Sequence, residues 1–202
     1  MTIGIVNYQA GNLGSLSSAL SELNLEFIVS DNPSEIERAS LILIPGVGSM
    51  SSGMTNIRNS GLDRVILNHA KEGKPVLGIC LGMHLLGTSG DEGGETQGLN
   101  LIKGEVKRLS PLPDYRVPHM GWDLVTYKTN TSVGYFAHSY YFQMSDEENQ
   151  EVISTFQWGS EVIPAEIRRM NIAGIQYHPE KSGKQGLTAL SKVIEDLREF
   201  TL

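Results

Sequence analysis

The stretch "KPVLGICLGMHLLG", residues 74–87, decides how the rest of the chain is interpreted. Its first part is short and apolar and predicts a buried strand over 74–79, and its second part has the spacing of a helix. Cys80 is the single cysteine of the sequence and lies between Gly78 and Gly82, at the junction. This G-x-C-x-G pattern is the thiol counterpart of a nucleophile elbow, in which a sharp turn between strand and helix exposes the nucleophile. The alternative is a buried cysteine that acts as a small hydrophobe.

The residues before this stretch alternate between the two kinds of secondary structure. Strands are expected over 2–8, 25–30 and 40–48, and helices over 11–24, near 33–39 and roughly over 53–70. In the first helix, leucines 13, 16, 20 and 23 share one face. Short strands that alternate with helices predict a parallel sheet covered on both faces.

The pattern changes after about residue 100, where strands follow one another without helices between them. They are expected over 103–110, 122–128, 134–142, 151–158 and 172–178, before a closing amphipathic helix over 186–200. Such strands predict antiparallel additions to the same sheet or a small companion sheet. We therefore expect an α/β fold with a central, mostly parallel sheet flanked by helices, additional antiparallel strands in the C-terminal half, and a single domain over residues 1–202.

Composition excludes several classes of function. The net charge is −7 and no cluster of Lys and Arg is visible, which argues against nucleic-acid binding. The single cysteine excludes an internal disulfide and points to a reducing compartment, and neither a signal peptide nor a long apolar span is visible, so a cytoplasmic location and no membrane partner are expected. The histidines lie far apart in sequence without paired ligand spacing, so no metal site is expected.

A glycine-rich turn follows the first expected strand and raises a competing interpretation. "YQAGNLGS" (8–15), with Asp31 further on, stands where a dinucleotide-binding loop would lie. Gln9 occupies the place of the first glycine of G-x-G-x-x-G, however. A tight turn is therefore favoured over a dinucleotide-dependent oxidoreductase, and no P-loop pattern occurs.

A nucleophilic cysteine needs a base, and "GIQYHPEKS" (174–182) supplies one. If this segment is a strand, His178 and Glu180 share a face. Glu180 can then orient the imidazole while His178 takes the thiol proton, as in a Cys-His-acid triad. The alternative is a surface His-Pro-Glu turn. It is weakened because both this segment and the cysteine elbow end expected strands.

Two backbone regions are candidates for an oxyanion hole. The amide of Leu81 follows the nucleophile directly and can point at a developing negative charge. The small residues of "IPGVGS" (44–49) leave amides free to bind an anion, so Val47 or Gly48 could supply the second donor. An ordinary turn is the alternative for this segment.

Together these segments resemble the triad-type, class I glutamine amidotransferases. The matching words are "AGNLGS", "PGVGS", "GICLGM", "KGEV", "HMGW", "HSYY" and "HPEKS", and they span nearly the whole chain. "HMGW" with "HPEKS" is more narrowly similar to the glutaminase subunits of imidazole glycerol phosphate synthases. The resemblance implies cytoplasmic glutamine hydrolysis without a cofactor. It also implies a heterodimer in which ammonia passes through the core of a (β/α)8-barrel cyclase in histidine biosynthesis.

The resemblance also implies roles for individual residues. Cys80 corresponds to the nucleophile, His178 to the base and Glu180 to its orienter, with Val47 and Leu81 as backbone oxyanion donors. Glu92 and the backbone around Ser139 and Tyr140 correspond to contacts with the two ends of glutamine. The face that meets the cyclase corresponds to Asn12, Pro118, His119, Met120, Trp122 and Lys181. A single tryptophan on a strand is often a core residue, which is the alternative for Trp122.

Three positions depart from the family's usual pattern. His84 stands where a glutamine usually holds the polar end of the substrate, so we expect His84 to bind substrate there. Asp123 replaces the usual asparagine after "HMGW", and Asn7 replaces an aspartate. Because of these departures a glutaminase subunit for another barrel synthase, such as one making an amidino sugar, remains an alternative. A second alternative, independent of the departures, is a non-catalytic regulatory partner. The intact Cys80, His178 and Glu180 argue against the second.

Overall fold

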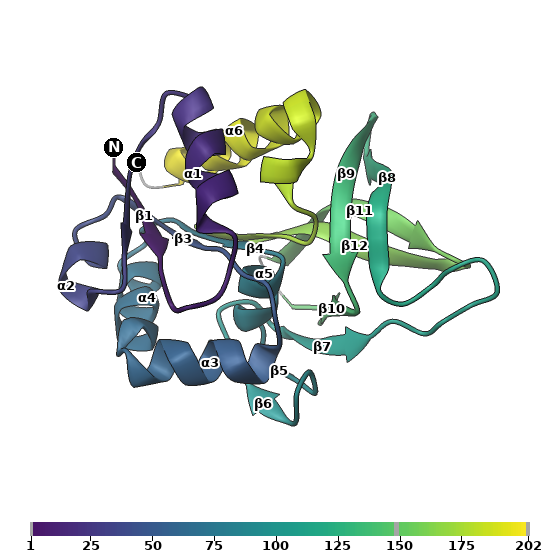
Figure 1. The fold of residues 1–202 in the computed structure, drawn as a ribbon, viewed down its shortest axis with the longest axis horizontal. Helices are drawn as coiled ribbons and strands as arrows, with labels where there is room; N and C mark the ends of the chain where they lie inside the picture. Colours follow the sequence, from purple (N-terminus) through teal and green to yellow (C-terminus); the bar gives the residue numbers. More distant parts are fainter. Residues whose placement is uncertain (1, 148–149, 201–202) are drawn as a thin grey trace.

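A computed structural model describes residues 2–147 and 150–200. Within them the largest sheet has the strand order β2-β1-β3-β4-β13-β12-β11-β8-β9 (Figure 1). Its parallel part consists of β1 (Thr2–Val6), β2 (Glu26–Ser30), β3 (Leu41–Ile44), β4 (Val76–Ile79) and β13 (Ile172–Ile175). Its antiparallel part consists of β12 (Glu161–Arg169), β11 (Gln150–Trp158), β8 (His119–Tyr127) and β9 (Thr131–His138).

A second sheet packs beside the first and has the order β10-β7-β5-β6. Its strands are β10 (Tyr140–Met144), β7 (Gly104–Arg108), β5 (Ser89–Gly90) and β6 (Thr96–Gln97). The antiparallel strands therefore both extend the main sheet and form a companion sheet. This confirms the expected fold class.

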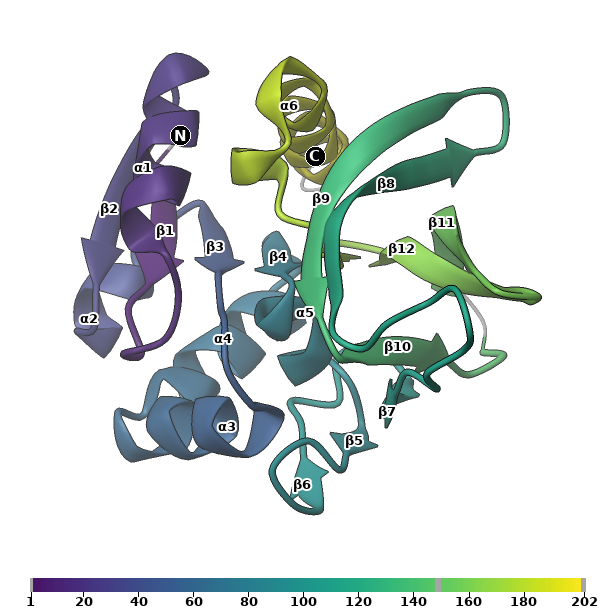
Figure 2. The ribbon, with the colours of Figure 1, turned by 45° about the vertical axis from the view of Figure 1, so that its right-hand side comes forward.

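Helices cover both faces of the main sheet (Figure 2). One face carries α1 (Leu13–Glu22) and α6 (Gly183–Glu199), which pack on apolar side chains of β1, β3, β4 and β13. The opposite face carries α2 (Pro33–Ile36), α3 (Met50–Asn59), α4 (Leu62–Lys71) and α5 (Leu81–Leu85). Each face thus has its own apolar core. Within the described ranges, none of the helices has the length and apolar character that a membrane span requires.

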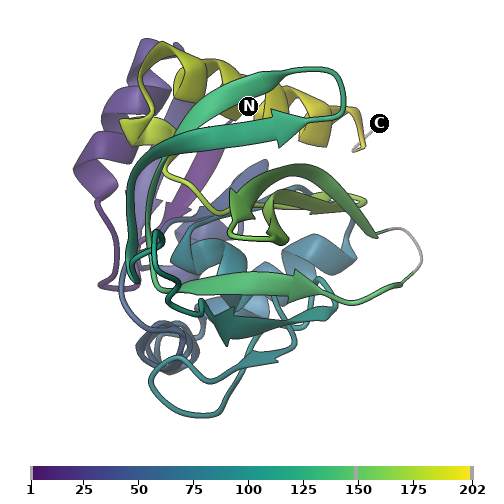
Figure 3. The ribbon, with the colours of Figure 1, turned by 90° about the vertical axis from the view of Figure 1, so that its right-hand side faces the viewer.

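The hairpin of β8 and β9 is long and curved, and it passes α6 (Figure 3). The amide of Val133 in β9 donates to Gln185 of α6 at 2.8 Å, which ties the hairpin to the body of the domain. The first residues of β8 and the last residues of β9 pair at the end of the hairpin that leads into β10.

Four sequence expectations were wrong in detail. The helix expected over 53–70 is two helices, because Gly61 adopts φ 74° between α3 and α4 and breaks the run. The strand expected over 134–142 is two strands in different sheets, because the chain bends at Ser139. The strand expected over 172–178 ends at Ile175. Strand β12 was not expected at all, and it contains Pro164, a residue that usually argues against a strand interior.

Candidate active site

Cys80 stands at the carboxyl end of β4, directly before α5. Its backbone has φ 52° and ψ −109°, a combination that non-glycine residues rarely adopt. Its amide donates to the carbonyl of Ile175 at 2.7 Å, and its carbonyl accepts from the amides of Met83 and His84. Strain of this kind persists where the surrounding structure holds it, and it is the geometry of a nucleophile elbow. Although Cys80 is buried, this backbone favours the nucleophile over an ordinary core cysteine.

The glycines on either side of Cys80 allow the turn to form. A β-carbon on Gly82 would lie 1.8 Å from the carbonyl oxygen of Ile44, at the end of β3. A β-carbon on Gly78 would lie 2.4 Å from the carbonyl oxygen of Gly82. Only glycine at these two positions allows helix α5 to approach the carboxyl ends of β3 and β4 this closely. The approach places Cys80 at the carboxyl ends of the parallel strands.

His178 and Glu180 form a buried pair. The Nδ1 atom of His178 lies 2.8 Å from the Oε1 atom of Glu180, and both side chains are almost fully buried. The sequence suggested that alternation along a strand would bring the two side chains together, but this prediction was wrong. Pro179–Lys181 instead forms a 3-10 turn, η1, which brings Glu180 back to the imidazole. Proline suits the first position of such a turn because its missing amide would have no partner there.

The imidazole of His178 is in an environment that favours its charged form. Burial lowers its pKa, but the interactions with Cys80 and Glu180 outweigh burial and raise the pKa to about 10. Its Nε2 atom is buried and makes no hydrogen bond within the described residues. Because Nδ1 is occupied by Glu180, Nε2 is the ring nitrogen available for proton exchange with Cys80.

The segment containing Val47 and Gly48 lies against the start of α5. A β-carbon on Gly46 would lie 2.2 Å from the hydroxyl of Tyr8 and 2.9 Å from the β-carbon of Leu81. That close approach brings the backbone of 46–48 beside the Leu81 amide, and Gly48 has φ 112°. The roles of Val47, Gly48 and Leu81 as oxyanion donors remain predictions.

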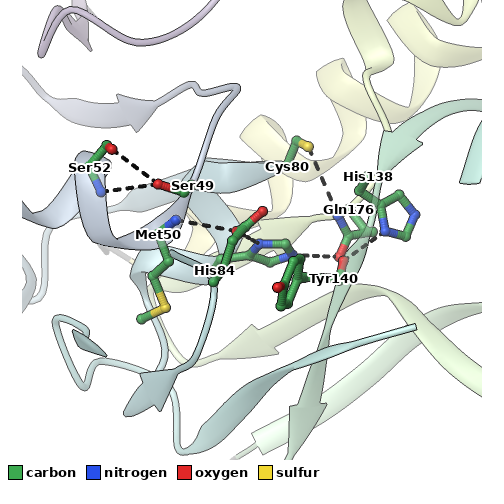
Figure 4. Close-up of polar contacts among 9 residues, drawn as sticks. Ser49, Met50, Ser52, Cys80, His84, His138, Tyr140 and Gln176 are labelled. Carbon is green, nitrogen blue, oxygen red and sulfur yellow. Dashed lines mark hydrogen bonds and ion pairs between the residues drawn. The ribbon is translucent and has the colours of Figure 1, made fainter. Parts of the chain in front are cut away.

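His84 connects two polar groups inside the site (Figure 4). Its Nε2 atom lies 2.9 Å from the Oε1 atom of Gln176, and its Nδ1 atom lies 3.7 Å from the Oε2 atom of Glu92. Glu92 also accepts a hydrogen bond from the amide of Met50 at 3.3 Å. Both ring nitrogens of His84 therefore face protein groups, and its contact with substrate stays a prediction.

Ser139 and Tyr140 lie where β9 leads into β10. The carbonyl of Ser139 accepts from the amide of Leu109 at 2.9 Å. The carbonyl of Tyr140 accepts from Nδ1 of His138 at 2.7 Å (Figure 4). These bonds hold the bend between the two sheets, and the predicted substrate contact of this backbone is untested.

The predicted partner residues divide between two faces of β8. Met120 and Trp122 are exposed on one face, together with Leu124. Trp122 is 58% exposed, so the alternative that it belongs to the core was wrong. His119 faces the opposite way and stacks on Phe136 with ring centroids 4.5 Å apart. It does not share the exposed surface with Met120 and Trp122.

The remaining partner candidates lie at turns. Pro118 is exposed, and Asn12 is the N-cap of α1, accepting from the amide of Ser15. Lys181 lies in η1 beside His178 and Glu180, with its ammonium 5.9 Å from the ring centre of Tyr135. Their contact with a partner is a prediction.

Gln176 is the site residue that sequence analysis missed. It is fully buried, and its Nε2 atom lies 4.0 Å from the sulfur of Cys80. Its position two residues before His178 was the available signal, since alternating residues of an extended segment point the same way. In the part of the chain that the structure describes, no group of His, Cys, Asp and Glu side chains is arranged to hold a metal ion.

Comparison with known proteins agrees with this geometry. A family model described as "Glutamine amidotransferase class-I" matches residues 5–194. The protein named imidazole glycerol phosphate synthase subunit HisH of Oceanobacillus iheyensis is 42% identical over 97% of this chain and 100% of its own length. The protein of the same name from Moorella thermoacetica is 40% identical, over 97% and 95%.

Solved structures share the fold. A crystal structure of a glutamine amidotransferase superposes with a TM-score of 0.78 over 96% of this chain and 97% of its own, at 19% identity. The PurLQS structure from Thermotoga maritima contains a chain that superposes with a TM-score of 0.70 over 97% of this chain and 98% of its own, at 18% identity. The arrangement of strands and helices around Cys80 is thus that of a known family fold.

Proposed function

Because the chain belongs to the class I glutamine amidotransferase family, we propose that it hydrolyses glutamine through Cys80, His178 and Glu180 and delivers the ammonia to a synthase partner. The family membership makes the chain a glutamine amidotransferase. The observation that carries the proposed mechanism is the strained Cys80 at the strand–helix junction, next to the buried pair of His178 and Glu180.

The proposed reaction begins with attack of the Cys80 thiolate on the side-chain carbonyl carbon of glutamine. The carbonyl π electrons move to oxygen, and the backbone amides of Leu81 and of the segment at 47–48 would stabilise the resulting oxyanion. The carbonyl then reforms, the carbon–nitrogen bond breaks, and the His178 imidazolium gives its proton to the departing ammonia. A glutamyl thioester remains on Cys80.

The second half of the reaction releases glutamate. His178, now neutral, takes a proton from water as the water oxygen attacks the thioester carbonyl carbon. Collapse of this intermediate breaks the carbon–sulfur bond and restores the thiolate next to an imidazolium. Glu180 holds the imidazole through Nδ1 in both halves, so that Nε2 always faces the reacting groups.

The proposed partner is a (β/α)8-barrel cyclase, with which this chain would form a cytoplasmic heterodimer in histidine biosynthesis. Support comes from relatives about 40% identical over nearly the full chain, each named as a subunit of imidazole glycerol phosphate synthase. The exposed Met120 and Trp122 would belong to the docking face. Partner binding would also switch on glutamine hydrolysis, if the peptide between Gly46 and Val47 rotates its amide towards the oxyanion only in the complex.

The test measures glutamate release with and without the purified barrel subunit of the same organism and that subunit's ligand. We expect Cys80→Ala to lower glutamine-dependent turnover by on the order of a thousandfold or more, while synthesis from added ammonium continues. Near-normal hydrolysis by this variant would refute the thioester route. Turnover that the partner does not change would refute the switching step and leave the catalytic residues unaffected.

A further inference from the structure

The side chain of Gln176 is a buried carboxamide to which the proposed mechanism assigns no role. Gln176 lies one residue after β13 and two residues before His178, and none of its surface is exposed. Burying a carboxamide is unfavourable unless its donors and acceptor find partners. Its backbone amide donates to the carbonyl of Ala165 at 2.8 Å, which fixes the main chain from which the side chain extends. The side chain itself points towards Cys80 and His84 (Figure 4).

The two ends of this carboxamide face different groups. Its oxygen lies 2.9 Å from Nε2 of His84, and its nitrogen lies 4.0 Å from the sulfur of Cys80. A carboxamide oxygen only accepts, so in this orientation Nε2 of His84 carries the hydrogen. The NH₂ group is then directed at the sulfur, where it favours a thiolate because a thiolate is an acceptor.

We propose that Gln176 is a positioning residue for the nucleophile: its NH₂ group donates to the Cys80 thiolate, and His84 holds the carboxamide in that orientation. The inference rests on the proposed role of Cys80. It also gives His84 a function besides substrate binding. Since Nδ1 of His84 faces Glu92, a short series of contacts joins Glu92, a predicted substrate contact, to the sulfur.

The substitution that separates positioning from packing is Gln176→Glu. It keeps the size of the side chain and an oxygen that can accept from Nε2 of His84, but it replaces the NH₂ group near the sulfur by a second oxygen. Gln176→Met is the companion variant, since it removes both polar ends and nearly preserves the shape. The matched control is Asn171→Leu, at the other end of β13. Asn171 is also a buried carboxamide, but it donates to the carbonyls of Ala70 and Lys74, away from Cys80.

The first measurement is the rate of Cys80 alkylation by iodoacetamide as a function of pH in the folded chain. We expect the midpoint of this profile to rise by at least about half a pH unit in Gln176→Glu and Gln176→Met, and to stay in place in Asn171→Leu. The existing titratable groups near the sulfur, Tyr8, His178 and Glu180, are unchanged in all three variants. Gln176→Glu adds a carboxylate, which would itself raise the midpoint, so the uncharged Gln176→Met is the variant that decides whether the lost NH₂ group matters.

The second measurement is glutamine hydrolysis in complex with the barrel subunit. Gln176→Glu should lower kcat about tenfold and change KM for glutamine little, since the lost contact is to the nucleophile. A role in packing alone would lower stability in all three variants without moving the alkylation profile. Alkylation needs no glutamine. If the wild-type complex fails to hydrolyse glutamine, the proposed function falls while the alkylation profile still decides the role of Gln176.

The third measurement uses NMR and does not depend on either Gln176 variant folding. The side-chain NH₂ resonances of Gln176 should shift over the pH range in which alkylation rises, and this shift should be absent in Cys80→Ser. Resonances that respond to pH identically in the two proteins would overturn the proposal. So would folded Gln176 variants with the wild-type alkylation profile.

Discussion

Gly82 of α5 and Gly14 of α1 each occupy the second position of a helix, but their surroundings differ sharply. A β-carbon on Gly82 would meet the backbone oxygen of Ile44 at 1.8 Å, whereas on Gly14 its nearest contact would be Asn12 Oδ1 at 3.9 Å. Real β-carbons essentially never approach other atoms within 3.0 Å, so Gly82→Ala must separate α5 from β3 by about 1.2 Å. Gly14→Ala requires no movement.

The two substitutions should therefore change stability in opposite directions. Replacing glycine by alanine in a helix stabilises by about 0.5–1 kcal/mol, which is the whole effect expected for Gly14→Ala. Overpacking of a well-packed region costs about 1–3 kcal/mol or more, and here the obstacle is backbone that cannot rotate away. We expect Gly82→Ala to lower the free energy of unfolding by about 1–3 kcal/mol in urea denaturation at 25 °C.

Activity should respond more strongly than stability to Gly82→Ala. Helix α5 carries the Leu81 amide and directly follows Cys80, so its displacement moves the proposed nucleophile and a proposed oxyanion donor together. A misplacement of about 1 Å can cost about a hundredfold in rate. Glutamate release by the complex should thus fall about a hundredfold in Gly82→Ala and remain normal in Gly14→Ala. Equal stabilities and equal rates for the two variants would refute the reasoning about this close approach.

Three other side chains lead to separate predictions. Burial and the charge of Lys74 lower the pKa of His69 to about 4, so His69 stays neutral in the fold while the unfolded chain protonates near pH 6.5. The contribution of neutral His69 to the free energy of unfolding is therefore fully present above pH 6.5 and is lost as pH falls towards 4. Between pH 7.5 and pH 5 the wild type should lose about 1–2 kcal/mol more than His69→Leu in urea denaturation. Trp122→Ser should weaken binding of the barrel subunit about thirtyfold by calorimetry, with stability within about 0.5 kcal/mol of wild type. Val162→Ser, at a similarly exposed strand position, is the control, and equal affinities for the two variants would place docking elsewhere. His84→Gln should lower KM for glutamine about tenfold, because a carboxamide offers both donors and an acceptor. An unchanged KM would mean that His84 contacts protein groups alone.

The parallel half of the fold was predictable because its signals are local. Apolar strands followed by helices with one apolar face leave few alternatives to a sheet covered on both sides. The leucines of α1 illustrate this, since Leu16 and Leu20 are buried on the face that the spacing indicated. The break at Gly61 was harder to predict because a glycine inside a helical pattern is tolerated, and only its left-handed backbone ends α3 before α4 begins.

The antiparallel half depends on pairing between residues that are far apart in the chain, and local sequence patterns do not reveal such pairing. Strand β12 was not predicted, and its Pro164 pairs with Thr155 of β11 where the register of the two strands shifts. The run 134–142 looked continuous because it contains five tyrosine or phenylalanine residues, which favour strands. Its division depends on the bond between His138 and the carbonyl of Tyr140, which bends the chain into the second sheet.

The sequence predicted those parts of the candidate site that lie in short, recognisable motifs. The words "GICLG" and "HPE" each lie at the end of a strand, and in a parallel sheet those ends share an edge. The strained backbone of Cys80 and the pair of His178 and Glu180 agree with that prediction. Gln176 was overlooked because a glutamine has no specific chemical signature until its neighbours in space are known.

Two of the three departures from the family pattern, His84 and Asp123, show the same limit of local sequence information. In sequence each is a single replacement of a carboxamide residue, with no visible compensation. In the structure each faces a group suited to it: Nε2 of His84 meets Gln176, and Oδ2 of Asp123 lies 3.2 Å from Nε2 of His119. Burial lowers the pKa of His119, and Asp123 opposes that effect. An asparagine could donate a hydrogen to a neutral His119, whereas a carboxylate only accepts and therefore favours a proton on Nε2. A departure from a family pattern thus acquires its meaning from the partner that the side chain meets in the structure. For His84 that partner, Gln176, lies far along the chain, and for Asp123 it is the half-buried His119, four residues earlier in β8.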